Sequence, residues 1–554
     1  MLLQNKYNVH LLMLFGVIAI LSVVTVSSYT IAVGDMAYQK LYWGRMAIVF
    51  VICSLISLCL DKRGGNTFYL SVVWSLILLG GVEAVWGLWQ IYGLAVSNHS
   101  LYALTGSFYN PGPYSGYLAM VFPICLSEWL NLRKVEKHTW VERGKYYMAL
   151  GVLLLILCVL PAGMSRSAWI AVAVSGIWVY GIHCSWGTRL RKIGKRYKKR
   201  VFLAMITAGI VLIIISYALF QLKVGSANGR LLIWKVSAMT VAEKPFLGHG
   251  IGNFASAYGM AQENYFARTE FTATEEQVAG SPEYAFNEYL QIAVEYGVLF
   301  LLVVLLIISF CLWKGITEKK ISACAGLISV LVFAFSSYPM QIPGFAIAFY
   351  FLLAACVVGK SRIHIYLFTV MIALLGSYYW KYNQYNACEE WLRCKMYYNI
   401  GAFRLAKEGY EKIYPELNDR GDFLFEYGHS LHKLKEYDHS TEVLKEAMMH
   451  SCDPMILNII GKNYQATGEY EKAEEYFIRS THRLPGRIYP YYLLAKLYVE
   501  PEYRHLEKLK QAVQIVLTKE PKVQSTAIKE MREEVKKLIK LSLIHISEPT
   551  RRRG

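Results

Sequence analysis

Long apolar runs dominate the first 380 residues of this chain, and they constrain its fold more than any other feature. A helix of 18 or more apolar residues can cross the roughly 30 Å hydrocarbon core of a bilayer, because it satisfies its main-chain polar groups internally. About eleven such spans are predicted, at residues 9–33, 43–60, 67–95, 114–131, 146–162, 168–184, 201–220, 292–313, 320–337, 345–358 and 362–379. The sequence therefore predicts an all-α fold in which residues 1–380 form a polytopic membrane domain.

A change in composition near residue 380 predicts a second domain. Of the 554 residues, 55% are hydrophobic and 18% are charged, whereas soluble proteins carry about 25% charged residues. Residues 381–540 are rich in Lys, Glu and Tyr, so we expect a water-soluble domain there. Residues 541–554 include the segment LIHISEPTRRRG, which breaks the helical pattern and resembles a translated sequencing adapter, so we expect a non-native tail.

The distribution of Lys and Arg predicts how the spans are oriented. Every second loop is basic, and short cytoplasmic loops are the ones that collect positive charge. Together 20 Lys and Arg residues lie in Asp61–Asn66, Asn131–Lys145, Gly187–Arg200, Lys314–Lys320 and Gly359–Arg362. This pattern places the N-terminus in the cytoplasm, and the loop 221–286 and the C-terminal domain outside it. The net charge of +18 then reflects topology and not a nucleic-acid partner, although Arg189–Arg200 alone could also bind anionic lipid or nucleic acid.

An internal repeat indicates the architecture of the C-terminal domain. At a period of 33 residues Gly428 matches Gly461, Leu424 matches Leu457, Tyr437 matches Tyr470 and Ser440 matches Ala473. A third unit follows, and residues 385–415 are expected to form a degenerate first one. Small residues at helix crossings, aromatic wedges and a proline after the second helix resemble tetratricopeptide repeats. Such an α-solenoid usually holds a peptide or protein partner, and a rigid cap over the membrane domain is the alternative.

Four polar clusters fall on the predicted outer face, and the first is the segment TGSFYNPGPYSGY at Thr105–Tyr117. Gly, Pro and Asn do not readily continue a helix, so a structured loop is expected between two spans. Main-chain amides around Ser107, Asn110 and Gly112 could bind an anion there. A tight connection without a ligand is the alternative.

The second cluster is SRSAW at Ser165–Trp169, where an arginine stands on the side of the membrane that positive charge usually avoids. An arginine at this depth is costly unless it is paired or functional. Phosphate is a natural partner for Arg166, because a guanidinium can bind it through two parallel hydrogen bonds. The alternative is an interfacial arginine that reaches lipid headgroups.

The third cluster lies in the outer loop and contains NGRLLIW at Asn228–Trp234 and KPFLGHGIGNF at Lys244–Phe254. Arg230 is a second candidate ligand for an anion. The glycine-rich run lacks the preceding strand and the spacing of a phosphate-binding P-loop, so His249 is expected to be a loop residue.

The fourth cluster is YAFNEYLQIAVEYG at Tyr284–Gly297. Asn287, Gln291 and Glu295 follow at intervals of four and share a face of the predicted helix, with Glu288 beside them. A polar helix end at the membrane interface is the alternative. No cysteine spacing resembles a zinc site, and no metal or cofactor is expected.

Taken in this order, GSFYNPGPYSGY, SRSAW, GRxxxW, GxGIGNF and NEYLQIAVEYG resemble the O-antigen ligase and polymerase family of the bacterial envelope. The resemblance covers roughly residues 65–355 and implies a metal-independent glycosyltransferase of GT-C type in the cytoplasmic membrane. Its donor would be a glycan on undecaprenyl diphosphate, and its acceptor another glycan, a lipid or a protein. A repeat-unit polymerase of the same fold and a non-catalytic transporter or assembly scaffold remain alternatives.

The resemblance also implies roles for individual residues. Arg166 and Arg230 match the arginines of the family's SR and GR motifs, which are thought to hold the diphosphate. Phe286 occupies the position of the family's usual catalytic histidine. Glu288 and Glu295, together with Asn287, are therefore the candidates to orient or deprotonate the acceptor.

Overall fold

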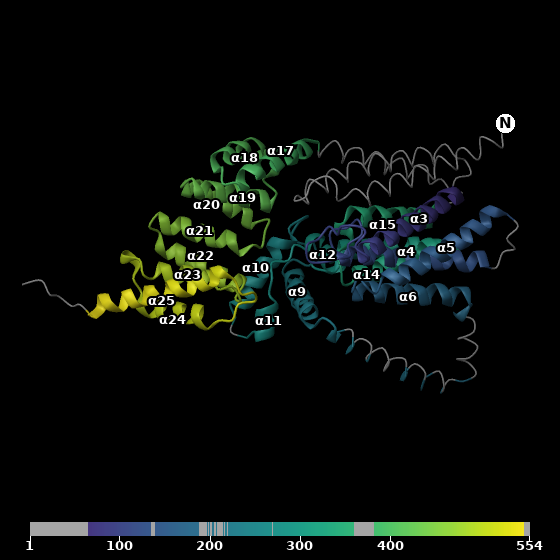
Figure 1. The fold of residues 1–554 in the computed structure, drawn as a ribbon, viewed down its shortest axis with the longest axis horizontal. Coiled ribbons are helices and arrows are strands. Elements are labelled where there is room, and N and C mark those ends of the chain that lie inside the picture. The colour runs from purple at the N-terminus through teal and green to yellow at the C-terminus, as the bar shows by residue number, and fades with distance from the viewer. Residues whose placement is uncertain are drawn as a thin grey trace, which may run out of the picture. The chain divides into compact units, whose positions relative to one another are not determined.

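The computed structural model describes residues 65–133, 139–187, 220–268, 270–358 and 382–547, together with isolated positions between 197 and 218. Every regular element in these ranges is a helix (Figure 1), which confirms the all-helical prediction for this part of the chain. The spans predicted at 9–33, 43–60 and 362–379, and most of 201–220, lie outside the described residues. The chain divides into two compact units.

The first unit comprises Met1–Leu222, Phe286–Tyr289 and Leu301–Tyr385. Its described elements correspond to seven predicted spans, and they are α3 (Gly65–Ile91), α4 (Pro111–Arg133), α5 (Trp140–Val159), α6 (Arg166–His183), most of α13 (Val298–Thr317), α14 (Ile321–Ala334), the short 3-10 helix η1 (Pro339–Gln341) and α15 (Pro343–Val357). Two of the described helices, the Phe68–Ile91 part of α3 and the whole of α13, are long and apolar enough to cross a membrane by themselves. The α14 and α15 helices are shorter apolar segments.

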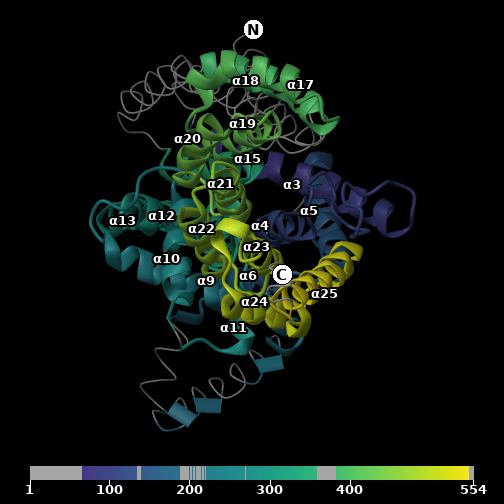
Figure 2. The same cartoon turned by 90° about the vertical axis from the view of Figure 1, so that its left-hand side faces the viewer.

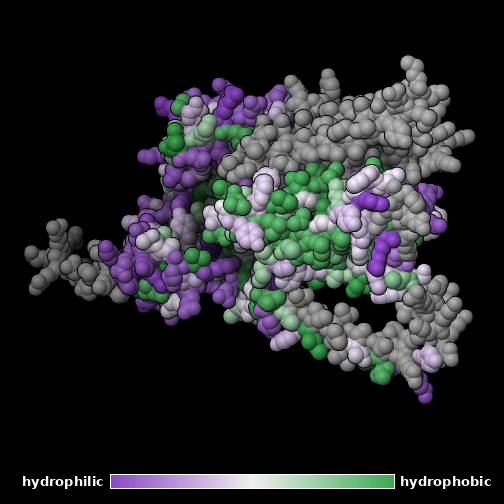
Figure 3. All heavy atoms as spheres, turned by 45° about the vertical axis from the view of Figure 1, so that its right-hand side comes forward, coloured by the Kyte–Doolittle hydropathy of each residue, from purple (hydrophilic) through white to green (hydrophobic). Residues whose placement is uncertain are grey.

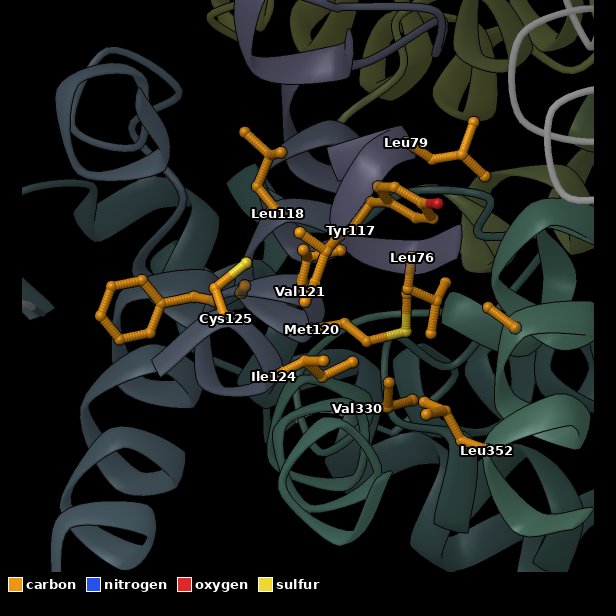
Figure 4. Packing of buried hydrophobic residues seen from close by; sticks show 14 of the residues in the cluster. Leu76, Leu79, Tyr117, Leu118, Met120, Val121, Ile124, Cys125, Val330 and Leu352 are labelled. Atoms are coloured by element: carbon orange, nitrogen blue, oxygen red, sulfur yellow. The ribbon is translucent and has the colours of Figure 1, made fainter. Parts of the chain in front are cut away.

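Helix α4 forms the centre of this unit. Its residues 113–125 are all buried, because α3, α5, α6 and α14 pack around it. Figure 4 shows side chains of α4 such as Val121 and Ile124 meeting Leu76 of α3 and Val330 of α14. Close packing at Gly116 depends on glycine, since a Cβ atom there would lie 2.3 Å from the ring of Phe333.

The outer surface of the first unit is apolar where α13 is exposed. Leu306 and Trp313 of this helix are 70% and 61% exposed. Figure 3 shows hydrophobic side chains gathered over the first unit, whereas hydrophilic ones predominate over the C-terminal helices. An apolar surface of this extent needs a lipid or protein environment to cover it.

The span predicted at 292–313 begins later than the sequence suggested. Helix α12 (Glu288–Tyr296) ends before Gly297, and α13 begins as a new helix at Val298. Gly297 has a φ of +85°, and a Cβ atom there would lie 2.0 Å from the carbonyl oxygen of Phe246. The chain can turn at this point because glycine tolerates both a positive φ and the close approach of another main-chain segment. Glu295 therefore belongs to α12 and not to the spanning helix.

The second unit joins the outer loop to the C-terminal domain. It comprises Lys223–Ala285, Leu290–Phe300 and Asn386–Gly554. Its outer segment, Lys223–Ala285, holds α9 (Val224–Glu243), α10 (Phe254–Phe266) and α11 (Ala273–Val278). The C-terminal helices are α17 (Tyr382–Asn399), α18 (Phe403–Leu417), α19 (Gly421–Lys433), α20 (Tyr437–Met448), α21 (Pro454–Ala466), α22 (Tyr470–Arg483), α23 (Tyr489–Leu497), the 3-10 helix η2 (Pro501–Tyr503), α24 (Leu506–Thr518) and α25 (Thr526–Ser547).

The C-terminal helices pack in consecutive pairs, with α19 against α20 and α21 against α22 (Figure 2). Gly428 and Gly461 lie at these crossings: a Cβ atom would come within 2.6 Å of Leu444 or 2.4 Å of Phe477. The repeated small residues thus have the packing role that the repeat predicts, while their assignment to tetratricopeptide repeats stays a prediction. Helix α25 continues to Ser547, so the expected tail is helical at its beginning.

Candidate functional site

The SRSAW segment forms the start of helix α6. Met164 adopts a left-handed conformation with φ of +46°, and Arg166 is the first helical residue. The Arg166 side chain is half-buried, and its Nη1 atom donates a hydrogen bond to the carbonyl oxygen of Phe220 at 3.3 Å. Ser165 is the N-cap residue of α6, and its side chain makes no capping hydrogen bond.

The NEY segment forms a second tight turn at the start of α12. Phe286 has a φ of +49°, which is uncommon for a residue with a bulky side chain, and its ring packs edge-on against Tyr338. Asn287 closes the turn by accepting a hydrogen bond from the amide of Tyr289 at 3.0 Å. Glu288 is only 5% exposed, and its Oε1 atom accepts a hydrogen bond from the amide of Met340 at 2.8 Å. The carboxylate therefore has a fixed orientation.

A cavity of about 400 Å³ connects these two turns within the first unit. Its walls are formed by Ser167, Ile170, Tyr289, Leu331, Val332, Phe335 and Ser336. Ser336 Oγ donates to Ser167 Oγ at 2.7 Å, and the Tyr289 hydroxyl donates to the carbonyl oxygen of Leu331 at 2.8 Å. The second and fourth polar clusters thus meet at one cavity, because Arg166 and Glu288 are the chain neighbours of Ser167 and Tyr289.

The loop of the first cluster is held by two polar residues of α3. Gln90 Oε1 accepts hydrogen bonds from the amides of Thr105 and Gly106 at 2.8 and 2.7 Å. The Glu83 carboxylate accepts from the amide of Ser107 at 3.1 Å and from its hydroxyl at 2.5 Å. These three amides bind the chain's own side chains, which favours a tight connection over an anion site.

The other candidates in this loop are also engaged locally. The amide of Gly112 donates to Asn110 Oδ1 at 3.2 Å, an arrangement typical of turns that open a helix. Sequence reasoning missed the role of Glu83 and Gln90 in holding the loop. The sequence pattern that could have indicated this role is the interval of seven residues between them in an apolar helix, which places both side chains on one face.

Arg230 lies in the second unit, on the half-buried side of α9. Five residues further along this helix, Lys235 Nζ donates hydrogen bonds to the Tyr265 hydroxyl at 2.8 Å and to Glu275 Oε1 at 2.7 Å. Partial burial would raise the pKa of Glu275, but hydrogen bonds from Lys235, Thr272 and Tyr265 outweigh it and lower that pKa to about 2. These contacts tie α9 to α10 and α11.

The glycine-rich run GHGIGN closes the end of α12. The amides of His249 and Gly250 donate to the carbonyl oxygens of Val294 and Glu295 at 2.7 and 3.0 Å. Gly248 and Gly250 have φ of +68° and +100°, so this path requires glycine. The run satisfies carbonyl groups that a helix end leaves unpaired, which gives it a structural role.

The loop residue His249 and the candidate base Glu295 also have local partners. His249 Nε2 lies 3.0 Å from the carbonyl oxygen of Thr240. Glu295 Oε1 accepts a hydrogen bond from Gln291 Nε2 at 2.7 Å, and Gln291 Oε1 accepts one from the amide of Ala285 at 2.8 Å. Part of the predicted polar stripe therefore forms a chain of hydrogen bonds within the second unit.

Helix α10 of the outer segment is clamped to α22. Arg483 Nη2 and Arg479 Nε donate to the two carboxylate oxygens of Glu263 at 2.6 and 2.8 Å. Gln262 Nε2 donates to the carbonyl oxygen of Arg483 at 2.6 Å. A Cβ atom at Gly259 would lie 2.7 Å from Arg483 Nη1, so the helices approach as closely as glycine allows. The outer segment that carries Arg230 is fixed to the C-terminal helices.

Comparison with known families gives a match over part of the chain. Residues 151–305 match the family model of O-antigen ligases, so the chain carries an O-antigen ligase domain. This range includes the second, third and fourth polar clusters, and the loop at Thr105–Tyr117 precedes it. The match supports, at a coarse level, a membrane-embedded glycosyl-transferring enzyme of the bacterial inner membrane. A comparison with curated proteins finds no match. Within the described residues, no group of three or more His, Cys, Asp or Glu side chains could hold a metal ion.

Proposed function

We propose that this protein transfers a glycan from undecaprenyl diphosphate to an acceptor glycan, lipid or protein at the outer face of the inner membrane. The observation that carries the proposal is the cavity shared by Ser167 and Tyr289, because it unites two motifs of the O-antigen ligase domain. The apolar part of its lining, which includes Ile170, Leu331 and Phe335, suits the first isoprene units of a lipid-linked donor. Ser167 and Ser336 would then be the polar groups of the lining that face the diphosphate.

Arg166 would bind the diphosphate from the first turn of α6. The N-terminus of α6 adds to the positive potential at this point, since helix N-termini favour anions. The bond between the anomeric carbon and the diphosphate oxygen breaks during transfer, and negative charge develops on the leaving oxygen. A guanidinium held in place stabilises that charge as it forms. Arg230, in the second unit, stays a second candidate ligand for an anion.

Glu288 would act on the acceptor. The acceptor hydroxyl oxygen forms the new bond to the anomeric carbon, its proton passes to the Glu288 carboxylate, and undecaprenyl diphosphate leaves. The amide of Met340 holds the carboxylate, and Asn287 fixes the turn from which it projects. A general base held in one orientation typically contributes about 10²–10⁴-fold to the rate.

The C-terminal helices, which we interpret as a tetratricopeptide-like solenoid over residues 381–540, are proposed to lie outside the membrane. The charge pattern of the loops supports this placement. They hold the outer segment through the clamp on Glu263. The outer segment and the C-terminal helices would then act together outside the membrane.

Deletion of the gene tests the proposal. We expect lipid-linked glycan to accumulate and its attachment to the acceptor to be lost, and the wild-type gene should reverse both effects. Chains of a single repeat unit would instead identify a polymerase of the same fold. Unchanged glycans together with the loss of a transported solute would overturn the enzyme interpretation. The structure argues against transport, because Glu83 and Gln90, the two polar residues of α3, hold a loop.

A further inference from the structure

A second cavity lies among the C-terminal helices and belongs to no step of the proposed reaction. It has a volume of about 620 Å³, and α21, α23 and α25 form its walls. Figure 2 shows α23 and α25 towards the C-terminal end of the stack and α21 nearer its middle. Its lining is rich in tyrosine, lysine and glutamate, unlike the apolar cavity beside Arg166.

Two tyrosine rings form one wall of this second cavity. Tyr489 and Tyr492 are three residues apart on α23, and their ring centroids lie 6.2 Å apart with planes inclined by only 24°. Lys462 Nζ donates to the Tyr489 hydroxyl at 2.5 Å, and the Tyr492 hydroxyl donates to Glu534 Oε2 at 2.5 Å. Both rings are partly buried and held from both sides, so a ligand would meet an ordered aromatic surface.

Hydrogen-bonding pairs surround this aromatic wall. Gln465 Nε2 donates to Glu500 Oε1 at 2.8 Å, and Lys496 Nζ donates to Glu534 Oε1 at 3.3 Å. Paired donors and acceptors of this kind match neighbouring hydroxyl groups, which both donate and accept. The cavity thus combines stacking surfaces with groups suited to hydroxyls.

The charge balance and the amide groups narrow the class of ligand. Two lysines and three glutamates line the cavity, so neither a polyanion nor a polycation is favoured. Gln465 is the one side-chain amide among the described residues that line this cavity, so an extended peptide main chain would find few amide partners there. Resting on the proposed function, we propose that this cavity binds a segment of a neutral or weakly charged glycan chain, away from the reacting sugar.

The test uses the purified full-length protein in lipid nanodiscs. The probe is the glycan released by mild acid from the lipid-linked donor that accumulates in the deletion strain, and binding is followed by saturation-transfer NMR and calorimetry. Tyr489→Ala and Tyr492→Ala should each weaken binding about tenfold or more. Tyr492→Phe should retain most of the affinity because it keeps the ring. Tyr397→Ala, which removes a 42% exposed tyrosine of α17, is the matched control and should bind like wild type.

Each result decides between outcomes. Wild-type affinity in the Tyr489→Ala/Tyr492→Ala double variant overturns the glycan cavity and leaves the proposed function standing. Equal loss in Tyr492→Phe and Tyr492→Ala overturns the stacking argument. If the protein binds a random dodecapeptide pool but not the glycan, and if the tyrosine variants lose this peptide binding, the cavity is a peptide site instead. If no lipid-linked glycan accumulates in the deletion strain, the proposed function fails, and this inference fails with it.

Discussion

Arg483 and Glu263 form a buried ion pair at 2.6 Å although they are 220 residues apart in the chain. The arginine side chain is only 2% exposed and the glutamate 13%. A buried pair contributes little net stability compared with apolar packing, but the loss of one partner leaves an uncompensated charge. The outer segment and the C-terminal helices are therefore mutually dependent.

We predict that Glu263→Gln destabilises the second unit by about 3–5 kcal/mol, because two arginines lose their common carboxylate. The change should appear as a lower thermal unfolding midpoint and as faster proteolysis within the outer segment. Glu270→Gln, at an exposed position of the same segment, is the matched control and should behave as wild type. The double variant Glu263→Gln/Arg483→Met should recover part of the loss, and an undiminished midpoint in Glu263→Gln would show that the clamp is dispensable.

The second prediction concerns the diphosphate. Arg166→Lys keeps the charge but cannot form two parallel hydrogen bonds, so we expect at least a tenfold loss of glycan transfer at normal protein levels. Arg230→Lys should have the same effect. Arg268→Lys, at an exposed position just after α10, serves as the control. Wild-type glycans in deletion strains that carry either arginine variant would refute the diphosphate role of that residue.

The third prediction separates the two candidate carboxylates. Glu288→Gln should slow transfer about tenfold or more, because its carboxylate is held beside the cavity. Glu295→Gln should slow it less, since Glu295 is engaged by Gln291 at 2.7 Å. Both substitutions preserve shape, so protein levels should hold in a quantitative membrane blot. Full activity in both variants would assign catalysis to arginine electrostatics alone.

A fourth prediction follows from a buried histidine of α19. Burial, reinforced by the charges of Lys433, His432 and Lys462, lowers the pKa of His429 from 6.5 to about 4. The Tyr398 hydroxyl lies 2.7 Å from its Nδ1 atom, as expected for a neutral ring accepting a hydrogen bond. The folded state favours the neutral form, so its stabilisation is complete above pH 6.5 and is lost as the pH falls towards 4.

The comparison for His429 is the unfolding midpoint of wild type and His429→Gln between pH 7 and pH 4. The wild-type midpoint should fall more steeply than that of the variant across this window. His439→Gln, at an exposed position of α20, should follow wild type. Parallel curves for wild type and His429→Gln would exclude His429 as the titrating group.

The fifth prediction concerns topology. Alkaline phosphatase fused after Tyr382 should be active, because this enzyme folds only outside the cytoplasm, and a fusion after Arg196 should be inactive. The reverse pattern would overturn the orientation derived from the loop charges.

The sequence predicted features that depend on local patterns. Apolar runs located the helices of the first unit, and the repeat spacing located Gly428 and Gly461 at helix crossings. The break at Gly297 was missed because a single glycine within an apolar run also occurs in continuous helices. Glycine is required at position 297 because Phe246, which is distant in sequence, approaches it closely.

The parts of the candidate site that the sequence missed depend on distant contacts. Glu263 and Arg483 look like ordinary surface charges of amphipathic helices, and only the packing of α10 on α22 buries them. The left-handed conformation of Phe286 has no signature in its residue type, since bulky side chains rarely adopt it. The structure brings Ser167 and Tyr289, the chain neighbours of Arg166 and Glu288, to one cavity, while the roles of Arg166 and Glu288 stay predictions.

The clamp between α10 and α22 limits which segments such proteins can exchange by recombination. A fragment cut at residue 380, where the composition changes, would expose Gln262 and Glu263 without their partners. A repeat domain transplanted from a relative would meet a foreign α10 and lack the matching arginines. Recombination that preserves function should therefore transfer the outer segment together with the C-terminal helices, as two distant stretches of one gene inherited as a pair.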